Sequence, residues 1–150
     1  MRKKHLYISL MLSLLLAACS SDEPAPVGPY ATLKFSANDI TISADEQDVV
    51  ADISCTENYK TWTNWGFETL WINDVPISFR NPIEDCTYDE ESMTIHYKDI
   101  VLSREDEGRK IKAHFGSNSN SSRILKVVIV PWGAQPGGML TITQQGKNGE

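Results

Sequence analysis

The chain has 150 residues, of which 20 are acidic and 14 are basic, so its formal net charge at pH 7 is −6. This acidic balance argues against a protein that binds nucleic acid or anionic lipid through its folded part. No apolar run reaches the roughly 20 residues that a membrane-spanning helix needs, which argues against an integral membrane protein.

The first nineteen residues have the three-part plan of a secretory signal. Three basic residues (2–4) precede an apolar run from Leu6 to Leu16, and two alanines lead directly into Cys19. Residues 16–19 resemble the lipobox of bacterial lipoproteins. The resemblance implies that residues 1–18 are a cleaved signal peptide and that Cys19 carries a lipid anchor. The alternative is an ordinary cleaved signal in which Cys19 has no role.

Residues 19–29 predict a tether between this anchor and a folded domain. The segment is small, polar and rich in proline, which extends a chain. Asp22 and Glu23 resemble the acidic export signal of Bacteroidetes lipoproteins, so we expect an outer-membrane lipoprotein that faces the cell exterior, with the periplasm as the alternative. Loss of three basic residues from 14 leaves 11 against 20 acidic ones, a net charge of −9. The lipid is the only membrane contact expected.

From Tyr30 onward, apolar residues recur with period two, which is typical of half-buried strands. Residues 59–73 predict two short strands, or one strand and an irregular loop. Pro76 limits residues 75–79 to an edge strand or a loop, and residues 81–92 are expected to be an open, acidic connection. The remaining expected strands lie within residues 32–35, 40–42, 49–55, 93–97, 100–102, 110–115, 123–130 and 139–144.

This spacing of short strands predicts an all-β sandwich or barrel. Residues 30–146 are expected to form one domain, followed by a tail of residues 147–150. The pattern from Lys110 to Gln145 resembles the C-terminal half of a BACON domain, in which an Asn/Ser turn (here residues 118–122) precedes an Arg (Arg123) and the last strand ends in Thr-Gln (Thr143-Gln144). The resemblance implies an immunoglobulin-like β-sandwich of about 7–9 strands and suggests a role in binding carbohydrate or mucin.

Two cysteines remain after Cys19. Cys55 and Cys86 form an even pair in a compartment that permits disulfides. A bond between them would close a loop of about 30 residues and stabilise the domain by roughly 3–4 kcal/mol. The alternative is two buried free thiols. Neither the cysteines nor the two strand histidines have the spacing of a zinc site, so no metal or other cofactor is expected.

Tryptophan provides the candidate binding residues. Sugars stack on aromatic rings, and Trp62, Trp65 and Trp71 lie within a short segment beside polar residues, while Trp132 lies in a loop between prolines and glycines. The alternative is that these rings fill the core of the sandwich.

The sequence contains no motif of a catalytic nucleophile, a phosphate-binding loop or a zinc protease. The carboxylates between Glu84 and Glu91 are interpreted as a solvated loop rather than as the acid pair of a glycosidase. The leading hypothesis is therefore a noncatalytic surface protein that binds a glycan or mucin. The alternative is a structural lipoprotein that binds an envelope protein.

Overall fold

The computed structural model describes residues 30–80 and 85–147. The expected signal peptide (1–18), the expected lipidation residue Cys19, the rest of the expected tether and residues 148–150 of the tail lie outside these described residues. Between residues 30 and 147, excluding 81–84, no helix is long and apolar enough to cross a membrane.

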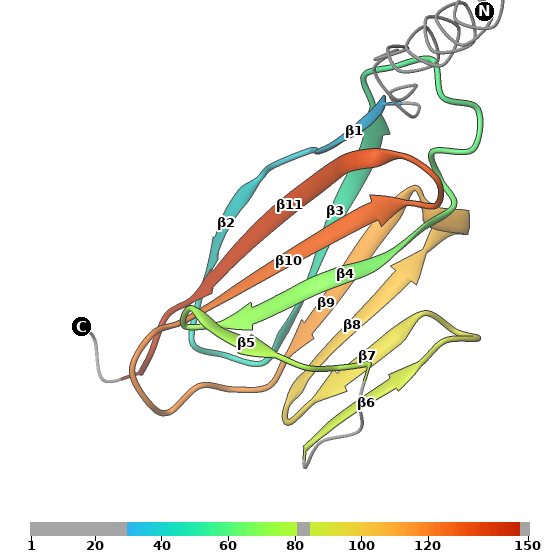
Figure 1. Ribbon diagram of the computed structural model, residues 1–150. Coiled ribbons are helices and arrows are strands. Elements are labelled where there is room, and N and C mark those ends of the chain that lie inside the picture. The colour runs from blue at the N-terminus through green and yellow to red at the C-terminus, as the bar shows by residue number, and fades with distance from the viewer. Residues whose placement is uncertain (1–29, 81–84, 148–150) are drawn as a thin grey trace, which may run out of the picture.

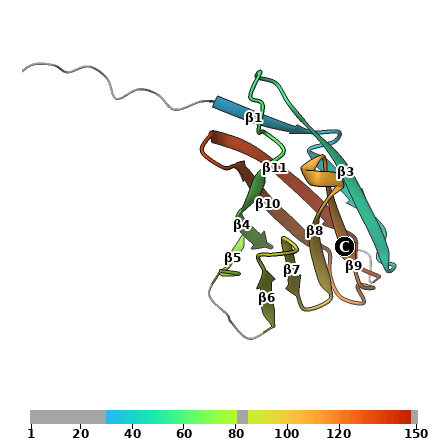
Figure 2. The same cartoon turned by 90° about the vertical axis from the view of Figure 1, so that its right-hand side faces the viewer.

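More than half of the described residues are in strands, which form two facing layers (Figures 1 and 2). A 3₁₀ turn, η2 (Asp106–Gly108), lies between two of them. The strands are β1 (Tyr30–Phe35), β2 (Asp39–Ile42), β3 (Gln47–Cys55), β4 (Trp65–Ile72), β5 (Val75–Ile77), β6 (Cys86–Asp89), β7 (Thr94–Tyr97), β8 (Ile100–Glu105), β9 (Lys110–Phe115), β10 (Arg123–Pro131) and β11 (Gln135–Gln144).

One layer, which we call the front sheet, has the strand order β5-β4-β10-β11-β2, and the back sheet has the order β3-β9-β8-β7-β6. Strand β1 joins them, because its first half pairs in parallel with β11 and its second half pairs antiparallel with β3. The central pairings β3-β9-β8 and β4-β10-β11 reproduce the B-E-D and C-F-G sheets of an immunoglobulin-like sandwich. The predicted all-β sandwich class is confirmed, although the described residues form eleven strands and not about 7–9.

The alternating strands supply the core between the layers. In β9, Ile111, Ala113 and Phe115 are buried, and in β10, Leu125, Val127 and Ile129 are buried, so each strand presents every second side chain to the opposite sheet. Trp65, at the start of β4, is 0% exposed and occupies the place of the buried tryptophan of immunoglobulin strand C. Its indole N–H donates to the Gly108 carbonyl at 2.7 Å.

Two strand boundaries differ from the expectation. Residues 86–89 form β6 and not an open connection, because Cys86 and Tyr88 point inward and alternate with the exposed residues Thr87 and Asp89. Strand β11 starts at Gln135, four residues earlier than expected. Gly137, with φ of +81°, and Gly138 allow this start, since a Cβ on Gly138 would lie 2.5 Å from the Leu33 carbonyl oxygen of the crossing strand β1.

The residues behind the BACON resemblance form a polar clamp at the opposite end of β10 from its turn with β11. The Arg123 guanidinium makes two 2.7 Å bonds to the Asp99 carboxylate, and its Nε donates to the Gln144 side-chain oxygen at 2.8 Å. Gln144 is fully buried, and its amide donates to the Gly116 carbonyl at 2.9 Å. This pairing lowers the pKa of Asp99, chiefly through the hydrogen bonds from Arg123. The clamp therefore joins the ends of four strands and is structural.

The predicted disulfide is not present, because Cys55 and Cys86 are both free thiols. Cys55 ends β3 and Cys86 begins β6, which lies four strand spacings away in the back sheet, about 19 Å. In register, Cys86 aligns through β7, β8 and β9 with Gln47, at the other end of β3. A disulfide requires Cα atoms within about 7 Å, so this topology excludes the bond.

The buried position of Trp65 predicts a large loss of stability in Trp65→Ala. Removing a fully buried indole and its hydrogen bond should lower the free energy of unfolding by about 3–5 kcal/mol. Trp132→Ala is the matched control, because the Trp132 side chain is exposed and its loss should change stability by no more than about 0.5 kcal/mol. Urea unfolding followed by circular dichroism measures both, and equal effects would contradict the assignment of Trp65 to the core.

The free thiols predict unequal alkylation by iodoacetamide at neutral pH. The thiolate is the reactive form, and burial raises the pKa of Cys86, so Cys55 should be labelled first in the native domain and both residues after unfolding. Mass spectrometry of peptides from the domain, handled without reductant, gives the order. Failure to label either cysteine after unfolding would indicate a disulfide and refute this arrangement.

Candidate functional site

A β-bulge in β4 determines which aromatic rings face the core. Along the pair of β4 and β10, Phe67 is opposite Ile129 and Thr69 is opposite Val128, so Glu68 has no partner. A bulge places two successive side chains on one side of a strand. Trp65 and Phe67 point inward before the bulge, Leu70 points inward after it, and Glu68, Thr69 and Trp71 lie on the outer face of the front sheet.

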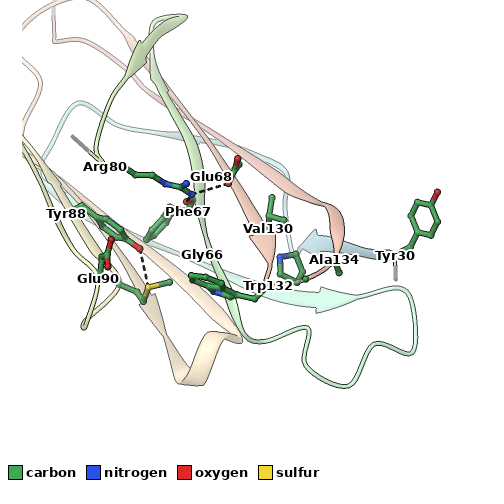
Figure 3. Close-up of a pocket in the computed structure, with 13 residues that line it drawn as sticks. Tyr30, Gly66, Phe67, Glu68, Arg80, Tyr88, Glu90, Val130, Trp132 and Ala134 are labelled. Atoms are coloured by element: carbon green, nitrogen blue, oxygen red, sulfur yellow. Dashed lines mark hydrogen bonds and ion pairs between the residues drawn. The ribbon is translucent and has the colours of Figure 1, made fainter. Parts of the chain in front are cut away.

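The bulge is held by Arg80. One guanidinium nitrogen of Arg80 donates to the Phe67 carbonyl at 3.0 Å and to the Glu68 carboxylate at 3.1 Å (Figure 3). Arg80 therefore satisfies a carbonyl beside the unpaired residue and holds the Glu68 side chain at the surface.

Trp132 occupies a tight turn between β10 and β11. Gly133 has φ of +76°, and the Ala134 N–H donates to the Pro131 carbonyl at 3.1 Å, which is the geometry of a type II turn with glycine in its third position. The Tyr59 hydroxyl donates to the Trp132 carbonyl at 2.9 Å, and the Trp132 N–H donates to the Asn64 carbonyl at 2.9 Å. The backbone of Trp132 is thus bonded on both sides, although 64% of the residue is exposed.

A groove of about 790 Å³ lies beside this ring, where the start of β4, the β10–β11 turn and the β6–β7 hairpin converge (Figure 3). Gly66 forms part of its floor. A Cβ on Gly66 would lie 3.6 Å from the indole nitrogen of Trp132 and 3.5 Å from the terminal methyl of Met93, so both side chains rest against this glycine. Tyr30, which is 59% exposed, lines the same groove from the start of β1.

Polar groups line the other part of the groove. The Arg80–Glu68 pair and Glu90 contribute charge, and the Tyr88 hydroxyl donates to the Met93 sulfur at 3.2 Å. The Tyr88 ring is packed edge-on against Phe79, with centroids 5.3 Å apart. Burial, and after it repulsion from Glu90, raises the pKa of Tyr88, so its hydroxyl remains a protonated donor at neutral pH.

The four candidate tryptophans do not form one site. Trp132 lines the groove, whereas Trp65 is completely buried and cannot stack on a ligand, which corrects the expectation for that residue. Trp62 lies in the turn before β4 and packs partly against the core. Trp71 is half-buried on the outer face of β4, outside the groove lining.

The sequence analysis missed most of the groove. Arg80, Glu68, Tyr88 and Met93 belong to strands or turns that fold beside Trp132 from distant parts of the chain. One signal was available: the apolar positions Trp65, Phe67, Leu70 and Ile72 contain a three-residue step in a period of two. Such a step indicates a bulge, and bulges are enriched next to functional sites.

The groove has the chemistry of a binding site for a small polar molecule with apolar faces. Its volume lies within the range of ligand sites, and an aromatic wall stands beside a few converging polar groups. Outside residues 1–29, 81–84 and 148–150, no group of His, Cys, Asp and Glu side chains has the arrangement of a metal site.

Comparison with known proteins identifies no family. No family model matches the chain, and no curated protein matches it. Among solved structures it is similar to the NMR structure of a protein from Bacteroides thetaiotaomicron, with 11% identity and a TM-score of 0.49 over 85% of this chain and 93% of that chain. It is also similar to titin domain M7, with 9% identity and a TM-score of 0.44 over 82% of this chain and 99% of that chain. At these scores the assignment of the fold rests on the strand topology alone.

Proposed function

We propose that this protein is a noncatalytic, lipid-anchored surface protein whose groove binds uncharged glycans. The observation that carries the proposal is Trp132, an exposed ring on a backbone that is bonded on both sides. Exposing a large aromatic ring leaves apolar area in water, and a fixed ring loses little conformational freedom when a ligand covers it. The C–H face of a sugar can stack on the Trp132 ring, and the hydroxyl groups of the sugar can form hydrogen bonds with Glu68, Arg80, Glu90 and Tyr88.

The charges of the groove favour an uncharged ligand. Arg80 is paired with Glu68, whereas Glu90 has no ion pair with any residue that the structure describes. The groove therefore carries one uncompensated negative charge, on a side chain that is exposed to solvent. A carboxylate or sulfate on the ligand would be repelled by it.

The proposed location rests on the N-terminal sequence. The resemblance of residues 16–19 to a lipobox and of Asp22-Glu23 to an export signal supports an outer-membrane lipoprotein anchored through Cys19 and exposed at the surface. The resemblance to BACON domains supports the same kind of role, glycan or mucin binding outside the cell, and it also agrees with the absence of a catalytic motif in the sequence.

The competing function, binding to an envelope protein, has less support. A partner that adds a strand needs a long, free sheet edge. The edge strands β5, β6 and β2 have only three or four residues, and β5 contains Pro76. The longer edge strand β3 presents the exposed carboxylates of Asp48 and Asp52 on its outer face and pairs with β1 at its C-terminal end. Short edges with proline or charge are the usual protection against strand addition.

The proposal predicts the outcome of a glycan array that contains neutral, sialylated and sulfated glycans and intact mucin. The domain from Val27 onward should bind neutral glycans, and Trp132→Ala should weaken that binding at least tenfold, about 1.4 kcal/mol or more, because the stacking ring is lost. The acidic versions of a bound glycan should bind more weakly, and Glu90→Gln should reduce the difference.

Val50→Ala is the control for this experiment, because Val50 is an exposed apolar residue on β3 of the back sheet, 54% exposed. It should leave binding unchanged. Binding that survives Trp132→Ala, with an unaltered melting temperature, would reject the groove as the site.

A further inference from the structure

The outer face of the front sheet continues from the groove. Val130 lines the groove and is opposite Gly66 on β4, and four residues earlier on β10 Lys126 is opposite Trp71. Directly opposite residues of antiparallel strands project on the same side of a sheet. Trp71 therefore lies on the same face of the sheet as Val130.

The bulge is responsible for this position of Trp71. Trp65 and Trp71 are an even number of residues apart, so on a regular strand both rings would face the core. The extra residue, Glu68, reverses the alternation and leaves Trp71 half-buried on the outer face. The same irregularity thus presents a carboxylate in the groove and a second tryptophan beyond it.

The distance between the two rings excludes a shared contact with a single sugar unit. Four residues of strand separate Lys126 from Val130, a length of about 13 Å, and Trp132 is two residues further along the chain. A ligand that contacts both tryptophans must therefore be a chain of several units.

The surface between the tryptophans suits an uncharged chain. Thr69, Val128 and Met139 lie side by side across β4, β10 and β11 at its middle, and Met139 is 53% exposed. The charged groups along it are neutralised in pairs, because Lys126 bonds to Asp74 at 2.5 Å and Arg80 bonds to Glu68.

We propose that the ligand is an extended, uncharged oligosaccharide that runs from Trp132 across the outer face of the front sheet to Trp71, which is its second stacking site. This inference rests on the proposed function of the groove and names the class of its ligand. Trp71 also lies directly opposite Pro76 on β5 and Lys126 on β10. If the Trp71 side chain only stabilised the sheet, its loss would lower the stability of the domain but would not change how affinity depends on the length of the oligosaccharide.

The test is isothermal calorimetry with ladders of cello-, xylo-, manno- and malto-oligosaccharides, from disaccharides to hexasaccharides. In the wild-type domain, hexasaccharides of the recognised ladder should bind at least about tenfold more tightly than its disaccharides. Trp71→Ala should remove this gain and leave disaccharide binding unchanged, whereas Trp132→Ala should weaken binding of both lengths.

Thr69→Arg provides a second variant, because it places a long side chain across the middle of the surface without removing a packed ring. It should also lower only hexasaccharide affinity, and Val50→Ala should change neither affinity. Affinity that does not rise with chain length, or a rise that persists in both Trp71→Ala and Thr69→Arg, would overturn the extended path while leaving the groove proposal intact. Binding of no ladder and no array glycan would overturn both proposals.

Discussion

Glu68 has no partner on β10, and this one unpaired residue determines how the aromatic side chains of β4 are distributed. Before it, Trp65 and Phe67 enter the core with their rings edge to face, 5.5 Å between centroids. After it, Leu70 is the residue that points into the core, and Trp71 points outward. Because a side-chain period of two admits no intermediate orientation, one extra residue is sufficient to separate a structural tryptophan from a surface one.

The groove also depends on the bulge at Glu68. Arg80 follows the edge strand β5 and reaches back to the Phe67 carbonyl and the Glu68 carboxylate, so the bulge is bonded from outside its own strand. Across the groove, Tyr59 and Asn64 hold the turn of Trp132. The two walls are therefore supported by separate sets of hydrogen bonds, which is the arrangement expected of a site that is formed before its ligand arrives.

The polar clamp, unlike the groove, offers no free polar groups to a ligand. The side chains of Arg123 and Gln144 bond to Asp99 and to the Gly116 carbonyl within the protein. The side-chain amide of Asn118 likewise donates to the carbonyls of Ser121 and Gln145. Polar sequence motifs of this kind can identify a fold without identifying a ligand site, because a buried polar group needs a hydrogen-bond partner whether or not a ligand binds nearby.

The sequence by itself determined the all-β class, most of the strands and the inward residues of the strands with unbroken alternation, such as β9 and β10. Local alternation is a property of neighbours in the chain, so no tertiary information is needed to recognise it. The sequence also singled out Trp132, since prolines and glycines around an aromatic residue predict a ring on a turn.

Only the tertiary structure decided where the other candidates lie. The separation of Cys55 from Cys86 follows from the strand order of the back sheet, and cysteine spacing carries no information about strand order. The burial of Trp65, the outward position of Trp71 and the meeting of Arg80, Tyr88 and Met93 beside Trp132 likewise depend on strand pairing over long distances in the chain. A binding groove is made by such pairings, whereas a strand is made by its own residues, and this is why the strands could be predicted and the groove could not.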